Sequence, residues 1–183
     1  MKVKNLLVVF LVLGVGLATN HLAMAQEVNL KEYNVLIVKD LDVPKGSPAP
    51  SSAGSLMAEK AVYQIQRYSQ KYNLFDLVAK EGEKGSKDVL SGKKVLIIKG
   101  EVKEYTHPTV GRRIGRSFIP GVGGHIGSAS FTAHYKFIDN ETGKVIYETD
   151  LRTLSTDAND TVEYAMDRNG EALAKMITKA KGK

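Results

Sequence analysis

The sequence has 183 residues, of which 25% are charged and 43% are hydrophobic, and it contains no cysteine. The chain therefore forms no disulfide bond and has no thiol for catalysis or for a lipid-modified N-terminus. Its formal charge of +6 is mild, and most lysines alternate with acidic residues, so nothing indicates a nucleic-acid-binding protein.

The first 25 residues have the pattern of an export signal. Two lysines are followed by the apolar run 6–18, and Ala-Met-Ala ending at residue 25 is the pattern that signal peptidase cuts after. An uncleaved anchor is the alternative, but the apolar run is shorter than the about 20 residues that span a bilayer. We expect cleavage before Gln26, which leaves a soluble domain, 26–183, that is periplasmic or secreted, without a lipid anchor or membrane insertion.

The mature chain begins with patterns of a strand and a helix. Segment 33–43 contains four consecutive apolar, mostly β-branched residues, which predicts a strand buried on both faces. Segment 44–54 is rich in proline and small residues and is typical of a loop. From Ser55, apolar residues recur at intervals of three and four, which predicts a helix over 56–72 with Ser55 as its N-cap.

Four further segments are predicted to be strands. Segment 73–80 has a weak strand pattern, and 94–105 begins with an apolar run and continues half-exposed. Segment 129–139 alternates cleanly between apolar and polar residues, which indicates one buried face. A hairpin turn with Gly143 available for positive φ leads into the last strand, 144–154.

The C-terminal segment predicts a second helix, with an apolar stripe over 162–180 and Asp160 and Glu163 in a broad capping-box spacing. The order of elements favours a single α/β (α+β) domain. We expect a mixed, mainly antiparallel sheet of about five strands, with two main helices packed on one face. The other face would be covered by the arm 26–32, by the glycine-rich loop described below, or by another molecule.

Several phrases of the sequence resemble a known group of proteins. "YNVLIVKDLDV", "KKVLIIKGEVKEY" and "FIDNETGKVIYE" are similar to a bacterial family of uncharacterised exported and lipoprotein domains. That family is similar in layout to the N-terminal α/β domain of the Tol translocation protein and to curli-secretion-type envelope lipoprotein domains. The resemblance covers 34–177 and implies an envelope domain of unknown function, with no catalytic residues to transfer. Many members carry a lipid-bearing cysteine, which this chain lacks.

The stretch 111–127, "GRRIGRSFIPGVGGHIG", is the main candidate for contact with a ligand or partner. It lacks the lysine of a phosphate-binding loop, and Ile126 stands where a dinucleotide-binding loop needs a glycine. Its arginines and glycine amides could hold an anion, and its apolar residues could touch an interface. A soluble connector between two strands is the plainer interpretation. The candidate contact residues are Arg112, Arg113, Arg116, Phe118, Ile119, Gly121, Gly123, Gly124 and His125.

Other chemistry-bearing residues form no motif. His107, His125 and His134 lack the paired spacing of a metal site, and His134 is expected on the polar face of its strand. No nucleophile elbow is present. Asp139 is explained better as a turn former. Tyr105, Tyr135 and Tyr147 are expected to close an edge of the core with their hydroxyls in water.

These patterns predict no cofactor and no metal. They favour a non-enzymatic envelope protein that binds or assembles with another envelope protein or an anionic envelope component. The alternatives are an enzyme with an unrecognised site around Asp42, His134 and Asp139, or a purely structural subunit that forms a dimer or ring.

Overall fold

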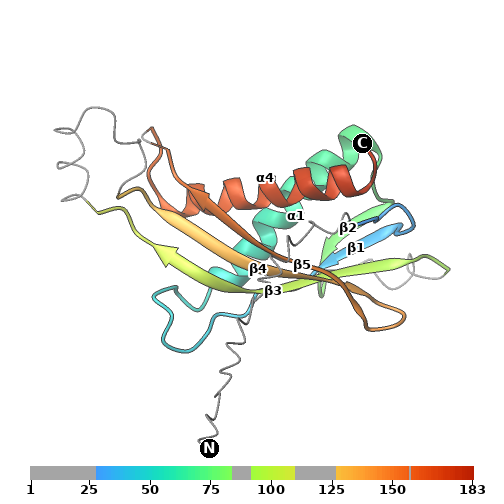
Figure 1. Ribbon diagram of the computed structural model, residues 1–183, viewed down its shortest axis with the longest axis horizontal. Coiled ribbons are helices and arrows are strands. Elements are labelled where there is room, and N and C mark those ends of the chain that lie inside the picture. The colour runs from blue at the N-terminus through green and yellow to red at the C-terminus, as the bar shows by residue number, and fades with distance from the viewer. Residues whose placement is uncertain (1–27, 84–91, 110–126, 157) are drawn as a thin grey trace, which may run out of the picture.

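The protein was analysed as a computed structural model, which describes residues 28–83, 92–109, 127–156 and 158–183. These residues form an α/β fold, a five-stranded mixed sheet with two helices on one of its faces (Figure 1). We call the face toward the helices the inner face and the opposite face the outer face. In chain order the elements are β1 (Val35–Val38), α1 (Ala53–Tyr72), β2 (Leu77–Lys80), β3 (Val95–Thr106), β4 (Ser130–Asp139), β5 (Val145–Leu154) and α4 (Val162–Ala180).

The strand order is β2-β1-β3-β4-β5. The strand β1 pairs in parallel with β2 and β3 over four residues each, whereas β3, β4 and β5 form long antiparallel ladders. The predicted mixed, mainly antiparallel sheet is therefore confirmed. β3 is the longest strand, and a bulge between Val102 and Glu104 bends it against β4.

The core lies between the inner face and the two helices. β4 supplies Phe131, Tyr135 and Phe137, all with no exposed surface, and the even-numbered residues between them point to the outer face. This alternation is the one that the sequence predicts. The strand β1 is buried on both faces, also as predicted, and Val35, Ile37 and Val95 form a small second cluster on the outer side.

Both helix starts differ from their predictions. α1 begins at Ala53 with Ser52 as its N-cap, so Ser55 lies inside the first turn. α4 has Thr161 as its N-cap, whose hydroxyl accepts a hydrogen bond from the Tyr164 amide at 3.1 Å. Asp160 instead accepts from the amide of Ala129 at 2.8 Å, and so ties the start of β4 to the loop before α4.

The tyrosine prediction was wrong for Tyr135. Its ring is completely buried and its hydroxyl donates to Oδ1 of Asn169 on α4 at 2.7 Å. Asn169 in turn donates to the carbonyl of Leu151 at 2.8 Å and to the hydroxyl of Thr153 at 3.2 Å. Burial raises the pKa of Tyr135, so this hydroxyl stays protonated and serves as a donor inside the core.

The described part of the N-terminal arm packs with the core rather than on the outer face. Leu30 is fully buried, and its amide donates to the carbonyl of Ala180 at the end of α4 at 3.0 Å. Among the described residues, neither helix has the length and apolar character that crossing a membrane requires.

Candidate functional site

The nine predicted contact residues of the glycine- and arginine-rich stretch lie outside the described residues. The described chain does show where this segment is attached. The amide of Thr109 donates to the carbonyl of Gly127 at 3.0 Å, so the two ends of the intervening segment meet beyond β3 and β4. The segment that carries the arginines is therefore attached at this end of the sheet.

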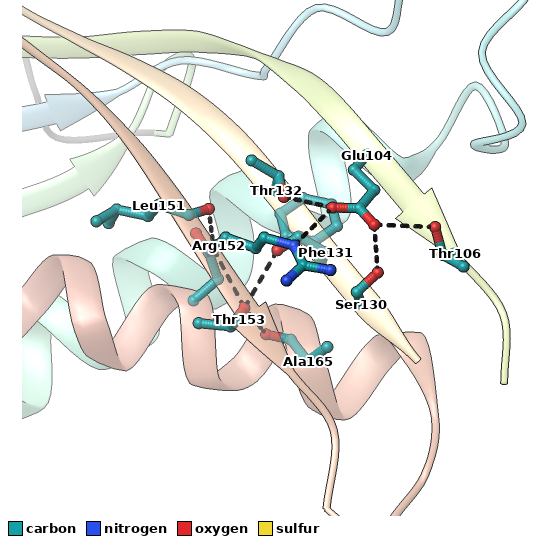
Figure 2. A network of polar contacts seen from close by, with 10 residues as sticks. Glu104, Thr106, Ser130, Phe131, Thr132, Leu151, Arg152, Thr153 and Ala165 are labelled. Atoms are coloured by element: carbon teal, nitrogen blue, oxygen red, sulfur yellow. Dashed lines mark hydrogen bonds and ion pairs between the residues drawn. The ribbon is translucent and has the colours of Figure 1, made fainter. Parts of the chain in front are cut away.

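A polar network on the outer face stands at the same end (Figure 2). The carboxylate of Glu104 on β3 accepts hydrogen bonds from Ser130 at 2.5 Å and from Thr132 at 2.8 Å, both on β4. It also accepts from Thr106 at 3.2 Å and forms an ion pair with Arg152 of β5 at 3.0 Å. One carboxylate thus connects three neighbouring strands.

The role of Glu104 is structural rather than that of a general acid or base. The hydrogen bond from Arg152, followed by those from Ser130 and Thr132, lowers the pKa of Glu104 to about 2 despite its partial burial. Such a carboxylate stays ionised at neutral pH, and its oxygens are already occupied. Its effect is to hold the strand ends in place where the segment 110–126 is attached.

Next to this network, the outer face is hollowed by a shallow depression of about 320 Å³. Its lining combines three lysines with two carboxylates and one histidine, supplied by β3, β4 and the chain after β1. The lining residues are Asp42, Lys99, Gly100, Glu101, Lys103, His134 and Lys136.

Gly100 lines this depression through its main chain. A Cβ atom at this position would lie 1.9 Å from the carbonyl oxygen of His134, so no other residue fits without moving the backbone. The chain after β1 also comes close here, because the Asp42 amide donates to the Gly100 carbonyl at 2.8 Å. The close contacts at Gly100 thus bring β3, β4 and the chain after β1 together at the depression.

The charges around the depression are partly paired. Lys103 pairs with Glu101, which lowers the pKa of Glu101 and raises that of Lys103. Lys136 lies 3.6 Å from Glu148 on β5. Lys99 is exposed, and no ion pair among the described residues involves it. The depression therefore offers at least one ammonium group to an incoming anion.

His134 lies on the outer face, as its strand pattern predicts. Its Nδ1 atom is 2.8 Å from Asp150 and its Nε2 atom is 3.0 Å from Glu148, both on β5. Both ring nitrogens thus face carboxylates of the neighbouring strand. Among the described residues, no group of three or more histidine and carboxylate side chains has a geometry that could hold a metal ion.

The residues of the alternative enzyme site do not converge. Asp42 and His134 both line the depression, but Asp139 is buried at the other end of β4. Its carboxylate accepts from the Thr142 amide at 2.8 Å and from the Tyr33 hydroxyl at 2.9 Å, and these bonds lower its pKa to about 2. Asp139 is a turn former, as the sequence predicts.

Sequence reasoning missed the Glu104 network and the depression. Glu104 was part of a half-exposed strand without an assigned role, and Lys99, Glu101 and Lys103 were interpreted as ordinary surface charges. One signal was present: Ser130 and Thr132 occupy alternate positions of β4, which places two hydroxyls on one face of the strand.

Comparison with known proteins gives similarity in structure only. No protein-family model and no curated protein matches the chain. The PelC dodecamer from Paraburkholderia phytofirmans has a TM-score of 0.48 and 12% identity, covering 78% of this chain and 90% of that chain. Protein XCC0632 from Xanthomonas campestris, described as DUF330, has a TM-score of 0.44 and 11% identity, covering 85% of this chain and 87% of that chain.

A third match is a putative neuraminyllactose-binding hemagglutinin homolog from Helicobacter pylori, with a TM-score of 0.42 and 11% identity, covering 81% of this chain and 83% of that chain. Other matched structures are described as lipoproteins. The matches thus include a family of unknown function and several lipoproteins, whereas the resemblance to the Tol and curli-secretion domains gains no support from them. At such low identity these matches assign no function to the chain.

Proposed function

We propose that this chain is an exported, non-enzymatic binding or assembly module of the cell envelope. It would engage a partner that presents carboxylate or phosphate groups, either another envelope protein or an anionic envelope component. The export pattern of the first 25 residues supports a location in the periplasm or outside the cell, and the absence of cysteine favours a mature form without a lipid anchor.

The observation that supports this proposal is the lysine-lined depression on the outer face. No helix of the described chain packs over it, and it contains an exposed lysine without a described ion-pair partner. It also adjoins the Glu104 network, which stands toward the strand ends where the arginine-rich segment is attached. Lysine and arginine would act together here, because nearby cations reinforce each other in attracting an anionic surface. We assign no catalytic role to Asp42 or His134, since Asp139 lies elsewhere.

Site-specific crosslinking in intact cells tests the proposal. A photo-reactive amino acid replaces Lys99 in the depression, and in the control it replaces Tyr63 of α1, which is 59% exposed on the helix side. We expect a discrete crosslinked product from position 99 and none of the same mass from position 63. The intact mass of the recovered chain also reports whether it begins at Gln26.

A second arm separates the arginines from the depression. The triple variant Arg112→Ser, Arg113→Ser, Arg116→Ser, combined with the reagent at position 99, should lower the yield of that product several-fold. Equal crosslinking from positions 99 and 63 would reject the outer face as the contact surface. Unchanged yield in the triple variant would reject the part assigned to the arginines.

A further inference from the structure

The strand β5 leaves one long edge of the sheet open. Among the described residues, this ten-residue strand (Val145–Leu154) is the last in the sheet order and pairs with β4 alone. The opposite edge strand, β2, has only four residues. A long edge strand presents a row of main-chain groups that can pair with another strand, unless the protein blocks it.

The hydrogen-bonding pattern shows which groups of β5 face this open edge. The Ser155 amide donates to the Ala129 carbonyl at 2.9 Å, which places Ser155 in a hydrogen-bonded pair with β4. Because such pairs alternate along an antiparallel ladder, the main-chain groups of Glu148, Asp150 and Arg152 point away from β4. No hydrogen bond from another described residue occupies these groups; α4 covers only the end of the edge, where Arg168 donates to the Leu154 carbonyl at 2.7 Å.

Apolar side chains along the same edge are only partly buried. Tyr147 and Leu151 on the inner face of β5, and Met176 on α4, pack against the core without being enclosed by it. Val145, at the start of β5, is 44% exposed. A second protein strand paired with this edge would remove some of the remaining apolar surface from water, which is favourable.

The charges of β5 favour a second copy of the same chain as the occupant. On the outer face, Asp150 and Arg152 project with 66% and 58% of their side-chain surface exposed. In a symmetric antiparallel pair of β5 strands, the residue at the two-fold axis lies opposite its own copy. An axis at Asp150 or at Arg152 would therefore place like charges opposite each other. An axis at Thr149 would place Glu148 opposite Asp150 of the other copy. Only an axis at Leu151 sets Asp150 opposite Arg152 of the other copy, twice.

We propose that two copies of this chain pair through β5 in antiparallel register, with the two-fold axis at Leu151, to form one continuous ten-stranded sheet. The outer face then carries a polar network across the junction, because Arg152 already contacts Glu104 and Asp150 already contacts His134. On the inner face the two Leu151 side chains meet. The charged depression lies on β3 and β4, away from the edge, so both copies keep it accessible.

The absence of cysteine makes a direct geometric test available. At the axis, Leu151 and its copy form a non-hydrogen-bonded pair with Cα atoms about 4.5 Å apart, which is within the range for a disulfide. The variant Leu151→Cys of the full mature chain should therefore oxidise to a covalent dimer. The matched control is Tyr63→Cys, on the exposed side of α1, which should remain mostly monomeric under the same conditions.

A charge-exchange series tests the register in solution without a crosslink. Analytical ultracentrifugation over a concentration series should show that Asp150→Arg weakens the dimer at least about tenfold, since it opposes two arginines at both junctions. The double variant Asp150→Arg, Arg152→Asp should recover most of this loss, because it restores opposite charges in the same places. Circular dichroism verifies that each variant is folded.

Two variants at Asp150 test the contribution of main-chain hydrogen bonds between the two β5 strands. Asp150→Pro removes an amide that points to the open edge, so β5 can stay paired with β4 while a second β5 is blocked, whereas Asp150→Ala keeps the amide. We expect Asp150→Pro to abolish the dimer and Asp150→Ala to weaken it only several-fold. A chain that stays monomeric at high concentration, or a dimer indifferent to these changes and to Leu151→Cys, overturns the proposal. The proposal is also overturned if this edge binds a strand of a different protein but the chain does not pair with a second copy of itself.

Discussion

The two faces of β4 hold their polar groups in different ways. On the inner face, the buried hydroxyl of Tyr135 is matched to Asn169 and the buried carboxylate of Asp139 to Tyr33, among apolar neighbours. On the outer face, Thr132, His134 and Lys136 contact ionised partners on the neighbouring strands. The inner face depends on close fit, while the outer face consists of charges that water can also satisfy.

This difference separates stability from recognition. Side chains enclosed by α1 and α4 determine the free energy of unfolding, because each is surrounded by packed neighbours. The exposed ion pairs of the outer face contribute little each, so they can change without loss of the fold. A surface of that kind is free to be adapted to a partner.

The largest expected effect on the free energy of unfolding comes from a substitution on the inner face. Phe137→Ala should lower the free energy of unfolding by about 3–5 kcal/mol, because Phe137 is fully buried and its ring meets that of Tyr147 edge-on at 5.5 Å. Lys136→Ala, the adjacent residue on the outer face, should change it by less than about 0.5 kcal/mol. Urea denaturation of the two variants measures this contrast, and similar losses from both would contradict the division between the faces.

A smaller effect is expected from the buried hydrogen-bonded pair of Tyr135 and Asn169. Asn169→Ala should destabilise the protein by about 2–3 kcal/mol, since the Tyr135 hydroxyl and the Leu151 carbonyl lose a partner inside the core. Adding Tyr135→Phe removes the orphaned hydroxyl, so the double variant should lose about 1 kcal/mol less than the sum of the single variants. Strict additivity in this cycle would mean that the two side chains do not act as a unit.

The smallest effect concerns pH and the outer face. The pKa of Glu104 is about 2 in the folded protein, against 4.5 for a free glutamate, so its contribution is complete above pH 4.5 and is lost as the pH falls toward 2. Because this group is only partly buried, we expect Glu104→Gln to cost about 1–2 kcal/mol at pH 7.

Denaturation at several pH values checks this sign. The difference between wild type and Glu104→Gln should shrink between pH 4.5 and pH 2, while the exposed turn variant Glu141→Gln provides the control for removing one carboxylate. Asp139, whose pKa is also lowered to about 2, is present in all three proteins and so does not contribute to the difference. A difference that grows at low pH would contradict the role of Glu104.

Much of the fold could be predicted because local pattern and tertiary environment agree. The alternation of β4 identifies Phe131 and Phe137 as core and His134 as surface, and the turn at Asp139 follows from its own hydrogen bonds to Thr142. The strand β1 is recognisable from its continuous apolar run. In each case the determining contacts lie within a few residues or follow a simple period.

The errors occur where a distant residue changes a local choice. α1 starts before Ser55 because Gly54 packs directly on the chain at Leu41, where a Cβ would lie 1.8 Å from a carbonyl oxygen. Asp160 is drawn from the helix start to the Ala129 amide, 31 residues away in the sequence. The hydroxyl of Tyr135 is buried because Asn169 reaches it from α4. No local pattern contains these partners.

The candidate site was less predictable than the fold. The Glu104 network needs the bulge in β3 and contributions from three strands, and the depression combines residues of β3, β4 and the chain after β1. The predicted contact residues between Arg112 and His125 remain a prediction, because they lie outside the described residues. What the structure adds is the place at which their segment is attached.

The bond between Leu30 and Ala180 has a consequence for biogenesis. The first and last described segments complete each other, and α4 carries fully buried residues such as Met166 and Leu173. The core cannot close until the C-terminal helix has been synthesised, because α4 supplies these buried residues. A chain that is still being synthesised would therefore lack part of its core and stay unfolded until α4 is complete.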